Sequence, residues 1–212
     1  MMAMLAFSSC SEEEEETVEE FPNWQETNDQ AFADTIAYAR ARIAAGDDNW
    51  KIYLSWALEG QTANTGSFIS DYGDESRIVV RIIEEGTGSG CPMYTDSVKV
   101  HYRGRLLPST SYSEGYVFDE TYSGEFSEET ALPTNLYVGS LIDGFTTALM
   151  QMHIGDRWMV YIPYNLAYGS STSSSVPAYS MLRFDIKLKG YYRPGAEVRS
   201  TDETSPGEWV LE

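Results

Sequence analysis

The chain has 212 residues, of which 42% are hydrophobic and 13% aromatic, so it holds enough apolar material for a folded core. Its formal charge of −19 would repel a phosphate backbone, which excludes nucleic-acid binding as a function class. No stretch of the sequence is long and apolar enough to span a bilayer.

The first ten residues are apolar, end in small residues and close on Cys10. They resemble the end of a bacterial lipoprotein signal, which predicts a lipid on Cys10, although the apolar run is short and no Lys or Arg precedes it. Seven of the nine residues 12–20 are glutamates, which is typical of a solvated tether. We therefore expect a location in the cell envelope, periplasmic or surface-exposed, anchored to the outer membrane only through Cys10. The alternative is an incidental cysteine in a cytosolic tail.

Cys10 and Cys91 are the only cysteines, so a disulfide framework is excluded. Cys91 precedes Pro92 in a glycine-rich turn and has no His or basic residue near it in sequence. We interpret Cys91 as a structural thiol rather than a nucleophile.

Two helices are expected after the tether. Asn28 or Asp29 is a candidate N-cap for the first, which would place Phe32, Ile36, Ala39 and Ile43 on one face and end near Gly46. The apolar spacing of residues 50–58 predicts a second, short helix. Such helices cannot bury their faces alone, so they would pack on the following domain or pair two chains into a homodimer.

Strand patterns begin at residues 68–69 and become strong at 77–85. Residues 97–104 alternate with period two, which places Val98, Val100 and Tyr102 on one face and Lys99, His101 and Arg103 on an exposed face. Further strands are expected at residues 117–118, 135–138, 158–162 and 181–191.

One amphipathic helix interrupts these strands. Apolar residues recur at three- and four-residue spacing between residues 141 and 152, which places them on one helical face: Leu141, Phe145, Ala148, Leu149 and Met152. The order of elements predicts an α+β fold, an antiparallel β-sheet curled around one central α-helix and preceded by a small helical extension. We expect a leader and tether at 1–22, the extension at 23–66, the main domain at 67–192 and a tail at 193–212.

Eight ordered blocks of this sequence resemble those of FKBP-type peptidyl-prolyl cis-trans isomerases. The blocks lie at residues 84–88, 98–104, 118–119, 141–145, 152–156, 162–169, 176–177 and 182–186. The resemblance implies the FKBP-like fold and catalysis of rotation about X-Pro bonds of exported or envelope proteins. It implies proline-containing polypeptides as substrates and requires no metal or other cofactor.

The same resemblance implies a pocket for the proline ring. Its catalytic positions correspond to Tyr102, Phe118, Asp119, Phe145, Tyr168 and Phe184. Leu141, Ile142 and Val176 correspond to further substrate-binding positions. Taken singly, each apolar member could equally be a core residue, Asp119 a turn residue and Tyr168 a surface tyrosine.

Four features depart from the family pattern. Phe145 stands where the family usually has tryptophan at the pocket floor, and a wall phenylalanine is replaced near Thr134. The loop at 107–116 is enlarged, and the flap at 170–175 is a polar serine-rich run. These departures favour an alternative, a non-catalytic module on the cell surface that binds peptides or glycans.

His101 and His153, the only histidines, do not form a recognisable zinc or Ser-His-Asp pattern.

Overall fold

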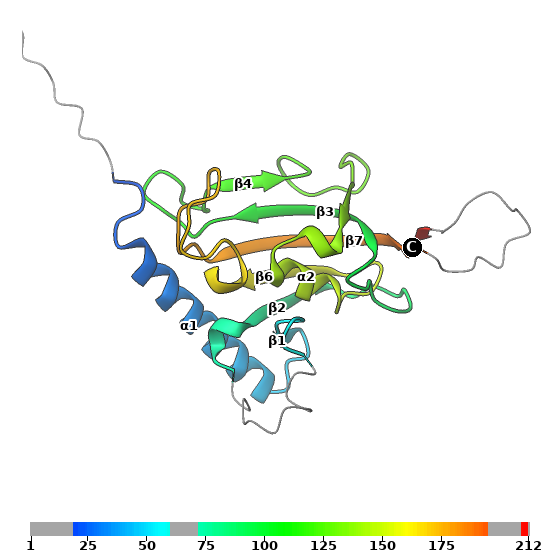
Figure 1. Cartoon of the computed structure of the whole chain (residues 1–212), viewed down its shortest axis with the longest axis horizontal. Helices are drawn as coiled ribbons and strands as arrows, with labels where there is room; N and C mark the ends of the chain where they lie inside the picture. The colour runs from blue at the N-terminus through cyan, green and yellow to red at the C-terminus, as the bar shows by residue number, and fades with distance from the viewer. Residues whose placement is uncertain (1–18, 60–71, 195–208, 212) are drawn as a thin grey trace, which may run out of the picture.

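The computed structural model describes residues 19–59, 72–194 and 209–211. Within these residues, eight strands form one antiparallel sheet in the order β1-β2-β6-β7-β3-β4, with β5 also paired to β3 and β8 to β7. Figure 1 shows α2 lying across the sheet and α1 running along its β1 and β2 side. The helices are α1 Trp24–Ala44 and α2 Asp143–Leu149. The strands are β1 Trp50–Leu54, β2 Arg77–Glu84, β3 Ser97–Arg105, β4 Val117–Glu120, β5 Thr134–Tyr137, β6 Arg157–Ile162, β7 Leu182–Tyr192 and β8 Trp209–Leu211. Short 3-10 turns occur at Asp74–Ser76, Val138–Ser140 and Tyr164–Leu166.

The α+β fold expected from the sequence is confirmed, and so are the strands expected between residues 77 and 191. Their pairing is antiparallel throughout, as short alternating strands favour. The strand expected at 68–69 lies outside the described residues. No helix in the described ranges is both long and apolar enough to cross a membrane.

Helix α2 fills the inner face of the sheet. Phe145, Ala148 and Leu149 are buried, as the spacing predicts, and Met152 is buried just beyond the helix end. Gly144 allows this close approach, because a Cβ there would lie 2.3 Å from a methyl carbon of Ile162 on β6. The helix is shorter than expected and begins after Leu141, since the Ile142 carbonyl accepts the first helical hydrogen bonds.

The expected N-cap at Asn28 or Asp29 is wrong, because α1 begins one turn earlier, at Trp24. The Asn28 side chain is instead buried within the helix, where Nδ2 donates to the Trp24 carbonyl and Oδ1 accepts from the Met181 amide. The end of the helix is as expected, since Gly46 takes the left-handed conformation at φ +82°. Phe32, Ile36 and Ala39 of its apolar face are buried in the chain's own core, whereas Ile43 is 41% exposed.

The second helix expected at residues 50–58 is also wrong. Trp50–Leu54 forms β1 and pairs with β2 in a continuous register from Trp50 opposite Arg81 to Leu54 opposite Arg77. Aromatic and β-branched residues are common in half-buried edge strands. The apolar pattern of residues 50–54 is too short to distinguish a helix from a strand, and pairing with the edge of β2 favours the strand. Both β1 and β8 lie outside 67–192, so the sheet extends beyond the expected domain limits on both sides.

The two helices cover opposite faces of the sheet. Ile162 of β6 contacts α2, whereas its neighbour Tyr161 stacks on Trp50 with ring centroids 6.3 Å apart. Trp50 in turn meets Tyr38 of α1 at 5.2 Å. Because successive strand residues point to opposite faces, α1 lies on the face away from α2.

His101 was expected on an exposed strand face and is buried, with 3% of its surface exposed. The ring of Phe126, from the loop between β4 and β5, covers it at a centroid distance of 5.2 Å. Burial lowers the pKa of His101, so this ring is neutral at pH 7. Alternation assigns residues to a face, but it does not show which loop will cover that face.

Candidate functional site

Four aromatic rings from four elements meet on the inner side of the sheet. Phe184 of β7 lies at their centre, with its ring centroid 5.0 Å from that of Phe145 and 5.4 Å from that of Phe118. Tyr102 of β3 completes the group at 6.3 Å from Phe184 and 5.8 Å from Phe145. Three of these pairs are edge-to-face, the arrangement that the ring quadrupoles favour. We call these four residues the aromatic cluster.

Strand register brings the cluster together. Gly104 of β3 lies opposite Phe184 of β7 on one side and opposite Asp119 of β4 on the other. A Cβ at Gly104 would lie 2.5 Å from the Phe118 ring and 2.6 Å from the Phe184 ring. Only glycine therefore leaves room for both rings above this strand. Gly104 is not among the site residues predicted from the sequence, although a glycine inside an alternating strand is a known sign of close approach.

A hydrogen bond fixes one wall of the site. The Tyr102 hydroxyl donates to Asp119 Oδ2 at 2.7 Å. Burial raises the pKa of Tyr102 well above its usual value, and the hydrogen bond to Asp119 and the charge of that carboxylate add to the shift, with a further contribution from the neighbouring Tyr168. Tyr102 is therefore a neutral donor at any physiological pH, and Asp119 orients its ring.

Tyr168 lies close enough to this pair to interact electrostatically with both members. Its side chain is 39% exposed, and burial together with the charge of Asp119 raises the pKa of its hydroxyl. Within the described residues, neither the Tyr168 hydroxyl nor the Ile142 amide makes a hydrogen bond, whereas the Ile142 carbonyl accepts from the amides of Phe145 and Thr146. Two unpaired donors are therefore available to carbonyl oxygens of a bound peptide.

The other two predicted substrate-binding residues border the core. Leu141 is partly buried against the core just before α2, and Val176 is 3% exposed within the flap, which we define in the structure as residues 170–181. The Val176 amide donates to the Ser173 carbonyl, and the Ser173 amide donates back, which closes a small turn. The structure thus brings Tyr102, Phe118, Phe145 and Phe184 into one cluster with Asp119. It places Tyr168, Leu141, Ile142 and Val176 in the segments that adjoin α2 and form the flap.

Other catalytic arrangements find less support. The fold brings His153 Nε2 to 3.8 Å from Cys91 Sγ, a proximity that sequence distance concealed. Burial, with the charge of Asp156, nevertheless raises the pKa of Cys91, which disfavours the thiolate. Across the described ranges, no group of three or more His, Cys, Asp or Glu side chains is arranged to hold a metal ion. Cys10 lies outside the described residues.

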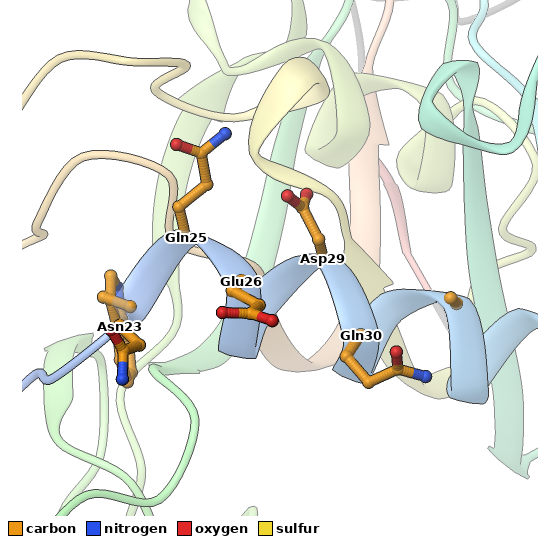
Figure 2. A pocket seen from close by; sticks show the side chains of 7 residues that line it. Asn23, Gln25, Glu26, Asp29 and Gln30 are labelled. Carbon is orange, nitrogen blue, oxygen red and sulfur yellow. The ribbon is translucent and has the colours of Figure 1, made fainter.

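A separate, open hollow of about 700 Å³ follows the first turns of α1, away from the aromatic cluster. Figure 2 shows polar side chains around it, with Glu26 and Gln30 on one side of the helix and Gln25 and Asp29 on another. These side chains spread apart rather than converge on a common point. The hollow therefore lacks the enclosed, convergent character of a ligand site.

Comparison with known proteins points to one family. Residues 88–189 match the family described as FKBP-type peptidyl-prolyl cis-trans isomerase. The chain is 37% identical over 129 residues to the macrophage infectivity potentiator of Trypanosoma cruzi, a match that covers 60% of this chain and 59% of that protein. It is 36% identical over 116 residues to the FKBP-type 22 kDa peptidyl-prolyl cis-trans isomerase of Escherichia coli, covering 54% of this chain and 50% of the relative. The chain thus spans between half and three-fifths of the length of these relatives.

A solved structure supports the fold. The crystal structure of a peptidyl-prolyl cis-trans isomerase from Pseudomonas syringae aligns with a TM-score of 0.50 at 24% identity, covering 77% of this chain and 92% of that one. At this identity the likeness speaks for the fold alone. With the family match, the sequence relatives and the aromatic cluster together, residues 88–189 form a domain of the FKBP-type peptidyl-prolyl cis-trans isomerase family.

Proposed function

We propose that the protein catalyses cis-trans isomerisation of X-Pro bonds in polypeptides, without a cofactor. The observation that carries the proposal is the aromatic cluster around Phe184, next to two unpaired hydrogen-bond donors. The roles of the individual residues follow from the family resemblance and from this arrangement.

The reaction needs only what such a site offers. Rotation about the X-Pro bond faces a barrier of about 18–20 kcal/mol that comes from amide resonance, and no covalent bond is made or broken. A ~1000-fold acceleration corresponds to about 4 kcal/mol of preferential binding to the twisted amide. An apolar pocket disfavours the polar, planar amide, because it removes the water that solvates the resonance form.

Each part of the site has a task in this proposal. The rings of Phe145, Phe184 and Phe118 hold the proline, with Tyr102 kept in place by Asp119. The Ile142 amide donates to a peptide carbonyl and so fixes the chain while the bond turns. The Tyr168 hydroxyl donates to a second carbonyl.

A protease-coupled assay with proline tetrapeptides, varied at the residue before proline, tests the proposal. We expect clear acceleration that is flat between pH 6 and 9, because the raised pKa values of Tyr102 and Tyr168 keep both hydroxyls protonated throughout that range. Tyr168→Phe should lower kcat/KM about fivefold, the effect of one lost hydrogen bond. Tyr137→Phe, at an exposed tyrosine outside the cluster, is the matched control and should leave kcat/KM unchanged.

Equal isomerisation rates with and without the protein, at concentrations well above its affinity for the peptide, would contradict the proposal. Binding of proline peptides or glycans without turnover would then support the alternative, a non-catalytic binding module.

We further propose that the protein works in the cell envelope, held to the outer membrane by a lipid on Cys10. A relative from Legionella longbeachae carries the name outer membrane protein MIP and is 35% identical over 138 residues, covering 61% of this chain and 54% of the relative. The glutamate-rich stretch at 12–20 would act as a solvated spacer between lipid and domain. Unchanged membrane fractionation of a Cys10→Ser variant would argue against the anchor.

A further inference from the structure

The first turns of α1 bind directly to the C-terminal end of the flap. The indole Nε1 of Trp24 donates to Ser180 Oγ at 2.7 Å, and Asn28 Oδ1 accepts from the Met181 amide at 2.8 Å. All four residues are buried, with Asn28, Met181 and Ser180 at 3% exposure or less and Trp24 at 9%. Two consecutive flap residues are thus fixed by an element more than 150 positions earlier in the chain.

The residue just before these two contacts has a strained backbone. Tyr179 adopts φ +61°, a left-handed conformation that residues other than glycine rarely take. Its amide donates to the Gly169 carbonyl at 2.9 Å and closes the base of the flap, and its ring meets that of Tyr164 at 5.3 Å. Such a conformation persists only where surrounding contacts impose it. The bonds from Trp24 and Asn28 to the next two residues supply that constraint.

The chain just before α1 also contacts the loop between β3 and β4. Glu20 accepts hydrogen bonds from the Ser109 hydroxyl and the Ser111 amide. These bonds lower the pKa of Glu20, so it is charged at neutral pH. The loop at 107–116 leads into β4, which carries Phe118 and Asp119. Figure 1 shows the chain entering α1 beside both this loop and the flap.

We propose that Trp24 and Asn28 are positioning residues that set the flap at 170–181 over the proline site and so determine which residues beside proline are accepted. The inference rests on the proposed isomerase function and extends it to the N-terminal helix. The flap holds Val176, a predicted substrate contact, and its serine-rich turn is closed by a single isolated backbone pair, Ser173 with Val176. The bonds from α1 therefore add an anchor at the C-terminal end of the flap, beyond that turn.

Two substitutions in the full-length chain test this. Asn28→Leu keeps the branched side-chain shape and removes both the acceptor for the Met181 amide and the donor to the Trp24 carbonyl. Trp24→Phe keeps an aromatic ring and removes the N–H donor together with part of the indole. We expect hydrogen exchange of the Tyr179 amide to accelerate about fivefold or more in each variant, because a lost buried hydrogen bond loosens the flap base. KM for proline peptides should rise about fivefold with kcat within twofold, and the preference for the residue before proline should broaden.

Arg40→Gln is the matched control. It breaks the exposed ion pair between Arg40 and Asp74, which joins the other half of α1 to the domain without touching the flap. This variant should leave flap exchange and KM at wild-type values. Ser180→Ala removes the bond from Trp24 and also the bond that Ser180 Oγ donates to the Pro177 carbonyl. A Trp24→Phe, Ser180→Ala double variant should therefore be no worse than Ser180→Ala alone.

The outcomes separate the two proposals. If the wild type turns over proline peptides while both variants keep wild-type flap exchange and KM, the positioning role is wrong and the isomerase function stands. If the wild type shows no turnover, the isomerase function is wrong. Hydrogen exchange of the flap amides and the affinity for proline peptides, compared between the wild type and the two variants, then decide whether α1 positions the flap. If Asn28→Leu does not fold, Trp24→Phe and the double variant decide the matter alone.

Discussion

Replacing Phe184 with alanine is expected to lower the free energy of unfolding by about 3–5 kcal/mol and kcat/KM at least about tenfold. Phe184 is 4% exposed on a central strand, and its ring contacts those of Tyr102, Phe118 and Phe145. Its removal opens a cavity and leaves three rings without their common partner. Urea unfolding measures the first effect, and the coupled prolyl assay, in conditions where the variant stays folded, measures the second.

Phe126→Ala is the control for this experiment. Phe126 is a partly buried aromatic residue like those of the cluster, but it lies on the opposite face of the sheet. There it contacts His101, Tyr122 and Arg157. Its loss should reduce stability and leave kcat/KM of the folded protein unchanged. Wild-type kcat/KM in folded Phe184→Ala would show that the aromatic cluster is not where proline binds.

The sequence predicted the sheet well, because its strands follow local rules. In β3, Val98 and Val100 are buried as period-two alternation requires, and β6 buries Trp158, Val160 and Ile162 in the same way. The central helix was recognised from spacing alone, although its start depends on the Ile142 carbonyl rather than on Leu141. Patterns within one element were therefore sufficient for most of this domain.

The errors share one cause, a partner far away in the chain. Asn28 looks like a cap, but its oxygen accepts from Met181; residues 50–54 look helical, but the edge of β2 makes them a strand. His101 looks exposed until the loop carrying Phe126 covers it. None of these partners can be read from the neighbouring residues, so tertiary contacts overrode local preference.

In the candidate site too, residues within local motifs were predicted and contacts between distant segments were not. Ordered family motifs predicted Tyr102, Phe118, Phe145 and Phe184, and the structure places their rings in contact. Their roles in catalysis stay predictions. The hydrogen bond between α1 and the flap could not be predicted, because Trp24 and Ser180 are 156 positions apart and no motif includes both.

Gly104→Ala is expected to lower kcat/KM about tenfold while reducing the free energy of unfolding by about 1–3 kcal/mol. The backbone of Gly104 is not in the left-handed region, so the cost is steric: the new methyl carbon would lie 2.5–2.6 Å from atoms of the Phe118 and Phe184 rings. Those rings pack edge-to-face with each other and with Phe145, so they cannot both shift away from the new methyl group without displacing the rest of the cluster. The pocket would change shape before the fold is lost.

Gly190→Ala separates this effect from crowding of the sheet in general. Gly190 lies towards the far end of β7, where a Cβ would meet the Val210 carbonyl oxygen at 2.4 Å and the Leu211 side chain at 2.6 Å, so alanine there displaces β8 and not the aromatic rings. We expect comparable loss of stability and wild-type kcat/KM. Equal effects of the two substitutions on kcat/KM would mean that general strain in the sheet governs activity. A tenfold loss confined to Gly104→Ala would instead tie activity to the position of two rings, because the two variants add the same methyl group to neighbouring strands of one sheet.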